Sequence, residues 1–161
     1  MTQPDPVRVA VNGYGVIGKR VASAVLAQTD MRLAGVADIA ADWRLRPLEA
    51  QDIGLFAATP EHVATMREAG LPIAGTLDDL LRQADLVVDC TPKRVAARNA
   101  EIYRANGLKF IIHGGEKHDV TGHSFVAEVS FDSAVGRAAT RVVSCNTTSI
   151  VRTLTALKRA G

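Results

Sequence analysis

The sequence is short of cysteine, of net charge and of long apolar runs, and each shortage excludes a class of protein. Its two cysteines, Cys90 and Cys145, lie far apart, which gives no disulfide framework and favours a reducing cytoplasm. The formal net charge is only +2, with scattered basic residues, so neither a nucleic-acid nor a membrane-surface partner is indicated. No apolar run could cross a bilayer, and the first residues lack the features of a signal peptide.

Aromatic residues are also few, at 4% of the chain, whereas alanine, valine and leucine are abundant. This composition suits a core of helices packed on a parallel sheet. The length of 161 residues predicts one domain with a full hydrophobic core, and no internal repeat divides it. We therefore expect residues 1–161 to be a single unit.

Short β-branched runs alternate with stretches of helical spacing along the whole chain. This order, with strands too apolar to be half-exposed, predicts a Rossmann-like, doubly wound α/β fold with a mostly parallel sheet. The predicted strands are 7–11, 32–37, 55–58, 86–89, 109–113, a weaker 125–129, and 141–144. The predicted helices are 17–28, 42–51, 60–69, one that opens at Thr76, 93–106, and 147–160.

A glycine-rich turn follows the first predicted strand and fits the pattern G-x-G-x-x-G. Gly13 permits a tight turn, Gly15 lets the backbone approach a pyrophosphate, and Gly18 allows the helix to pack closely on the sheet. The amides at the start of that helix would face the phosphates. The predicted cofactor-binding residues of the turn are Gly13, Tyr14, Gly15, Val16, Ile17 and Gly18.

Asp38 ends the second predicted strand, twenty residues after Gly18, and bears on which dinucleotide is bound. A carboxylate there can accept hydrogen bonds from both ribose hydroxyls and repels a 2′-phosphate. Two alternatives remain open, because Asp38 could be a solvated loop acid and Arg44 or Arg46 could bind that phosphate. The sequence therefore favours NAD and leaves NADP possible.

Cys145 lies between the last predicted strand and the last predicted helix. A thiol at a helix N-terminus has a lowered pKa, and the free amides there could hold an oxyanion. A buried structural cysteine explains the position equally well. Cys90 lies at the end of an apolar strand and is predicted to have a packing role in the core. The sequence places none of the four histidines as a base for Cys145.

Three segments together resemble the archaeal-type (type II) glyceraldehyde-3-phosphate dehydrogenases: 11–20, 113–117 and 142–148. The resemblance spans about 7–157, and Ser-Cys-Asn-Thr-Thr at 144–148 is its most specific motif. It implies that Cys145 attacks an aldehyde to give a thiohemiacetal, that a hydride passes to the nicotinamide, and that phosphate cleaves the resulting thioester. It also implies that Asn146 helps to hold the oxyanion and that Thr91 and Gly114 line the cofactor groove.

The same resemblance implies a second domain that supplies the general-base histidine and the substrate-phosphate contacts, and we expect this domain to be absent from the 161 residues. The chain would then bind dinucleotide with little turnover alone, and glyceraldehyde 3-phosphate and phosphate would need the missing domain. Two other functions remain open: a stand-alone dinucleotide-binding module, completed by a partner chain or self-associated, and a domain of another cysteine-dependent semialdehyde dehydrogenase. Neither metal, nucleic acid nor membrane is expected as a partner.

Overall fold

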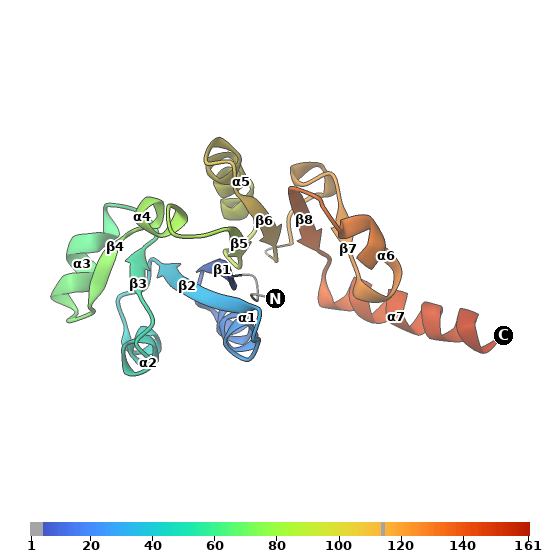
Figure 1. Cartoon of the computed structure of the whole chain (residues 1–161), viewed down its shortest axis with the longest axis horizontal. Helices are drawn as coiled ribbons and strands as arrows, with labels where there is room; N and C mark the ends of the chain where they lie inside the picture. The colour runs from blue at the N-terminus through green and yellow to red at the C-terminus, as the bar shows by residue number, and fades with distance from the viewer. Residues whose placement is uncertain (1–4, 114) are drawn as a thin grey trace.

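A computed structural model describes residues 5–113 and 115–161, and these form one sheet of eight parallel strands (Figure 1). The strand order is β4-β3-β2-β1-β5-β6-β8-β7. The strands are β1 Val7–Asn12, β2 Met31–Asp38, β3 Leu55–Ala57, β4 Ile73–Thr76, β5 Leu86–Asp89, β6 Lys109–Ile112, β7 Ser124–Phe125 and β8 Ala139–Val142. The α-helices are α1 Val16–Leu26, α2 Arg46–Ala50, α3 His62–Glu68, α4 Leu77–Leu81, α5 Val95–Ala105, α6 Ala127–Ala134 and α7 Cys145–Ala160, and two 3-10 turns, η1 Trp43–Leu45 and η2 His118–Val120, join them.

Helices cover both faces of the sheet, as the doubly wound prediction required. Ala10 and Val11 are neighbours on β1 but belong to different buried clusters, because successive side chains of a strand point to opposite faces. Helices α4 and α5 bury Leu80 and Tyr103 on the face of Ala10. Helices α1, α2 and α3 pack on the other face, where Met66 is fully buried.

The central strand β1 pairs with β2 on one side and with β5 on the other, so the winding of the chain reverses between β1 and β5. Ligands of open α/β sheets bind at such a reversal, beyond the carboxyl ends of the strands. Backbone hydrogen bonds hold these ends together: the Cys90 amide donates to the carbonyl of Asn12 (2.7 Å), and the Gly13 amide to that of Ala37 (2.7 Å). The fold therefore brings the glycine turn and the Cys90 loop to one edge.

The predicted strands at 7–11, 32–37, 55–58, 86–89 and 109–113 are all present with small shifts at their ends. The prediction for 125–129 was wrong beyond Phe125, because β7 ends there and α6 follows. At the start of α6 the Ser130 hydroxyl accepts from the Val126 amide (2.8 Å). Strand β4 was not predicted, since Ala74 and Gly75 at its centre give no strand signal.

The last helix begins two residues earlier than predicted, at Cys145 rather than Thr147. Ser144 is the N-cap, and its hydroxyl accepts a hydrogen bond from the Thr147 amide at 3.2 Å. The preceding strand correspondingly ends at Val142 instead of Ser144. Cys145 is thus the first helical residue of α7. No helix in the described ranges combines the length and apolarity needed to span a membrane.

Candidate active site

Two of the three motif glycines are required by the packing of the protein itself. Gly13 has a φ of +92°, and a Cβ there would lie 3.0 Å from the carbonyl carbon of Cys90 and from the Thr91 amide nitrogen. A Cβ on Gly18 would lie 1.8 Å from the carbonyl oxygen of Gly13. Both positions therefore need glycine for the turn and for the contact between α1 and β1.

Gly15 differs, because a Cβ on it would meet no protein atom within 4 Å. It is the exposed N-cap of α1, where no side chain caps the helix and the first turn holds no acidic residue. The amides of this turn therefore face open space with the positive end of the helix dipole behind them. A phosphate group would satisfy them, and the absence of a side chain at Gly15 leaves room for its approach.

Asp38, at the end of β2, points its carboxylate back toward this turn. One oxygen accepts from the Tyr14 amide at 2.5 Å, and the other from the amides of Ile39 and Ala40 at 2.7 and 2.8 Å. The backbone thus fixes the orientation of the side chain. Asp38 is not a freely solvated acid.

A cavity of about 370 Å³ opens between the turn and Asp38. Arg44 lines it, but its guanidinium is paired with the carboxylate of Asp42, with a shortest distance of 2.6 Å. Trp43, beside Arg44, is 75% exposed, and the Lys19 ammonium lies 5.9 Å from its ring centre. The wall consists of Asn12, Gly13, Tyr14, Gly15, Asp38, Ile39, Ala40, Arg44, Leu45, Ala58, Thr59, Cys90, Thr91, Pro92, Val95 and Asn99.

Beneath this cavity lies a buried polar network that the sequence did not predict. Asp89 is fully buried and accepts from the Thr91 amide (2.8 Å) and hydroxyl (2.5 Å), from Asn99 (2.8 Å) and from the Tyr103 hydroxyl (2.7 Å). Asn12 donates to the same Tyr103 oxygen at 2.8 Å. Burial, with the neighbouring Asp89 carboxylate, raises the pKa of Tyr103. The network holds the predicted groove residue Thr91 in place.

Glu116 is a second buried carboxylate that the sequence did not single out, although it lies inside the motif at 113–117. Its side-chain carboxylate accepts hydrogen bonds from the amides of Arg94 and Ala97 and so caps the start of α5. Its backbone carbonyl accepts from the Arg141 guanidinium (2.7 Å). The loop after β6 is thereby fastened both to α5 and to β8. Gly114, the predicted groove residue of this loop, lies outside the described residues.

Cys145 is exposed at the first position of α7, with its thiol 3.9 Å from the side-chain oxygen of Asn146. It lines a cavity of about 700 Å³ to which Ile17 of the glycine turn and His113 at the end of β6 also contribute. Burial lowers the pKa of His113, so the ring is neutral at neutral pH. The predicted nucleophile and the predicted pyrophosphate turn therefore border one open space.

Two further residues, Cys90 and His123, take structural positions. Cys90 is half-buried between two apolar clusters, and burial raises the pKa of its thiol to about 12. His123, one of the four histidines, is buried and hydrogen-bonded to Thr140 (2.7 Å) and Ser133 (2.9 Å). Within residues 5–113 and 115–161, no group of His, Cys, Asp and Glu side chains could hold a metal ion.

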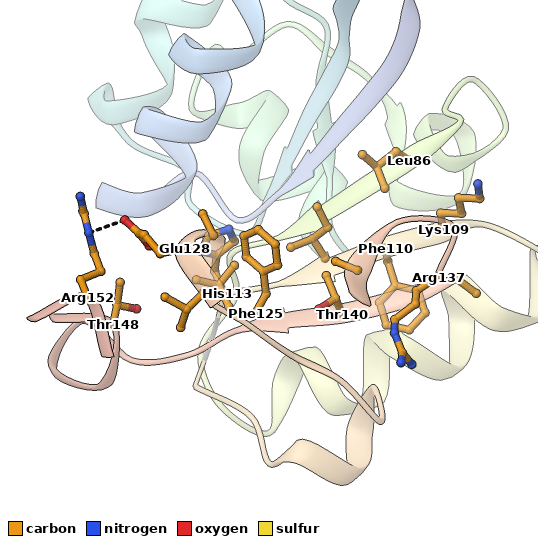
Figure 2. A pocket seen from close by; sticks show the side chains of 16 residues that line it. Leu86, Lys109, Phe110, His113, Phe125, Glu128, Arg137, Thr140, Thr148 and Arg152 are labelled. Atoms are coloured by element: carbon orange, nitrogen blue, oxygen red, sulfur yellow. Dashed lines mark ion pairs between the residues drawn. The ribbon is translucent and has the colours of Figure 1, made fainter. Parts of the chain in front are cut away.

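A further cavity, of about 540 Å³, adjoins the Cys145 cavity and opens between β6, β8, α6 and α7 (Figure 2). The two share His113, Val142, Thr148 and Arg152 in their walls. Across it, Arg152 of α7 pairs with Glu128 of α6 at 2.6 Å, the ion pair drawn as a dashed line in Figure 2. Apolar side chains, among them Phe110 and Phe125, form much of the remaining wall.

The parallel sheet, the reversal between β1 and β5 and the uncapped glycine turn define a Rossmann-type domain that binds a dinucleotide. The chain belongs to the family described as "Dihydrodipicolinate reductase, N-terminus", which matches residues 7–121. Two solved structures share this fold. GenD2 from gentamicin A biosynthesis, in complex with NAD, matches with a TM-score of 0.52 and 20% identity, over 70% of this chain and 28% of that one. UDP-N-acetylglucosamine 3-dehydrogenase GnnA from Acidithiobacillus ferrooxidans matches with a TM-score of 0.50 and 24% identity, over 67% of this chain and 28% of that one.

In sequence the chain is similar to archaeal glyceraldehyde-3-phosphate dehydrogenases, which confirms the resemblance seen in the three motifs. The relative from Methanothermobacter thermautotrophicus is 49% identical over 92% of this chain, and that from Archaeoglobus fulgidus is 49% identical over 94%. The relative from Pyrococcus furiosus is 44% identical over 94%. The chain spans 44%, 45% and 46% of the lengths of these three relatives.

Proposed function

We propose that the chain is the cofactor-binding and nucleophile-bearing part of a phosphorylating glyceraldehyde-3-phosphate dehydrogenase. The observation that carries this proposal is the cavity shared by Ile17 of the glycine turn and the exposed Cys145. The 44–49% identity to enzymes of that name supports it. A dinucleotide fits the residues present, because Gly15 leaves open space next to the amides at the start of α1.

The diphosphate would bind the amides at the start of α1, with the adenosine in the cavity between the turn and Asp38. NAD is favoured over NADP. The Asp38 carboxylate, held by three backbone amides, would repel a 2′-phosphate, and the guanidinium of Arg44 is already paired with Asp42. Thr91 and Gly114 are proposed to line the groove farther along.

When bound, the dinucleotide supplies the hydride acceptor. Cys145, as thiolate, would add to the aldehyde carbon to give a thiohemiacetal, and loss of hydride would leave a thioester. Attack by phosphate then breaks the carbon–sulfur bond, releases an acyl phosphate and restores the thiolate. We propose that the amides of Cys145 and Asn146, at the start of α7, stabilise the oxyanion.

For the 161 residues on their own we expect dinucleotide binding with little turnover. By the resemblance, a second domain supplies the general-base histidine and the phosphate-binding residues, and losing a general base alone typically costs about 10²–10⁴-fold. Because the chemistry needs a free thiol, the cytoplasm is the proposed compartment.

The test is a titration with NADH and NADPH, using Trp43 as reporter. It is the single tryptophan of the chain and directly precedes Arg44, which lines the cavity, so its emission should be quenched by energy transfer to a bound reduced nicotinamide. We expect tighter binding of NADH than of NADPH, and a loss of about tenfold in NADH affinity in Asp38→Asn. This variant should also be less stable to heat, because an amide group cannot accept all three hydrogen bonds from the Tyr14, Ile39 and Ala40 amides. Absence of binding by both nucleotides at millimolar concentration would refute the proposal.

Two other functions remain candidates with distinct signatures. In a binding module without catalysis, the Cys145 thiol would have ordinary reactivity, and its alkylation rate would not change when the cofactor binds. A semialdehyde dehydrogenase would share the activated thiol but prefer an unphosphorylated substrate. The rate of Cys145 alkylation with and without NAD distinguishes the binding module from the two dehydrogenases, with the half-buried Cys90 as internal reference.

A further inference from the structure

Helix α7 presents a polar face to the Cys145 cavity. Five of its side chains line that cavity, at spacings of three, four and seven residues that place them on one side of a helix. Arg152 is the only cation among these five and lies two turns after Cys145. The five are Cys145, Thr148, Ser149, Arg152 and Thr153.

The Arg152 side chain can reach from its own turn toward the thiol. Seven residues of helix rise by about 10.5 Å, and side chains of an α-helix lean toward its N-terminus, in this case toward Cys145. The side chain is 64% exposed and is held only at its edge, where its Nε contacts Glu128 at 2.6 Å. Figure 2 shows this pair beside Thr148.

A guanidinium flanked by hydroxyl groups is a chemical match for a phosphate or carboxylate. We propose that Arg152 is a specificity-determining residue that binds the anionic end of the substrate while Cys145 attacks its carbonyl, and that Glu128 competes for the same guanidinium when the anion is absent. This inference rests on the proposed function, since it assumes that Cys145 is the nucleophile. It assigns a role to an ion pair that would otherwise only join α6 to α7.

The experiment compares alkylation of Cys145 by iodoacetate, an anion, with alkylation by the neutral iodoacetamide, followed by mass spectrometry. We expect Arg152→Gln to lower the ratio of the iodoacetate rate to the iodoacetamide rate about threefold, because one positive charge near the thiol is removed. Arg152→Lys should keep most of the ratio, and Glu128→Gln should raise it. Inorganic phosphate should slow both reactions in the unmodified protein but not in Arg152→Gln.

Arg159→Gln is the matched control, because Arg159 lies on the same face of α7 two turns farther from the thiol. It should leave the ratio unchanged. An unchanged ratio in Arg152→Gln, or an equal change in Arg159→Gln, would overturn the inference. Since Cys145 is exposed, both reagents reach it whether or not it is catalytic, so this result stands apart from the nucleotide titration that tests the proposed function.

Discussion

Gly15 and Gly18 lie three residues apart in one motif, yet their surroundings are opposite. A Cβ on Gly18 would collide with the backbone of Gly13 at 1.8 Å, whereas a Cβ on Gly15 would enter open space. The packing of the protein therefore explains the second glycine of this pair, and we propose that a bound diphosphate explains the first.

These surroundings predict opposite effects of two alanine substitutions. Gly15→Ala should cost no more than about 1 kcal/mol of stability, the scale of an N-cap change, and should weaken NADH binding by tenfold or more, because the methyl group fills the approach to the amides. Gly18→Ala should cost about 3 kcal/mol or more, because backbone must move. Thermal denaturation and Trp43 quenching measure the two effects. Normal NADH affinity in Gly15→Ala would contradict this account.

The residues that the sequence revealed are those whose role depends on near neighbours. Gly13 and Cys145 are recognisable because a turn or a helix start lies beside them in the chain. Asp89, Tyr103 and Glu116 are not, because their partners come from distant segments: Asn12 and Tyr103 are 91 residues apart, and Glu116 and Arg94 are 22 apart. Only the folded sheet shows that they hold the Thr91 loop and cap α5.

At the scale of elements, the same contrast separates the predicted strands from the missed one. Valine makes up half of strands β1 and β5, and the burial of their later residues on both faces follows from this apolar composition. Strand β4 lies at the edge of the sheet because it pairs with β3, and its own residues give no strand signal that predicts this pairing. The start of α7 was missed by two residues, since Ser144 could cap a helix only once β8 had ended.

A surface ion pair joins β1 to the start of β5 and predicts how stability depends on pH. Arg8 donates to Asp85 through its backbone amide (2.9 Å) and its guanidinium (2.5 and 2.9 Å), which lowers the pKa of Asp85 from the usual 3.8 to about 2. A carboxyl whose pKa is depressed on folding stabilises the protein above its unfolded pKa. That contribution is lost as pH falls from about 4 to about 2.

Asp85→Asn should therefore lower the thermal midpoint at neutral pH and make it fall less steeply between about pH 4 and pH 2 than in the unmodified protein. Asp132→Asn is the control, since Asp132 takes part in no ion pair among the described residues. It should leave the acid dependence unchanged. Parallel melting curves for the unmodified protein and Asp85→Asn over this range would show that the pair has no such role.

At the scale of the whole molecule, the two halves of the proposed site lie on opposite sides of one turn. The cavity between the glycine turn and Asp38 lies at the ends of β1, β2 and β5, and the Cys145 cavity lies between α1, β6 and α7. The first half follows from a local motif and could be predicted from the sequence. The second half depends on α7 beginning beside His113 of the β6 end and Ile17 of α1, which the pattern of strands and helices implied but the individual residues did not.

Helix α7 also has an apolar stripe, on the side opposite its polar face. Ile150, Leu154 and Leu157 are each about 60% exposed, and Phe131 of the neighbouring α6 is 61% exposed. Figure 1 shows α7 extending away from the sheet. Exposed apolar surface of this kind is typical of an interface, which the proposed second domain would provide.

For the 161 residues alone, the stripe predicts self-association that rises with concentration. Leu154→Glu should shift the sedimentation profile toward monomer, because a charge at the centre of the stripe must be desolvated in any contact. NADH binding, measured by Trp43 quenching, should not change, since Leu154 lies outside both cavity walls. Ala156→Glu adds the same charge to the same helix off the stripe and should leave association as it was. A monomeric unmodified chain at high concentration would show that this face does not drive association.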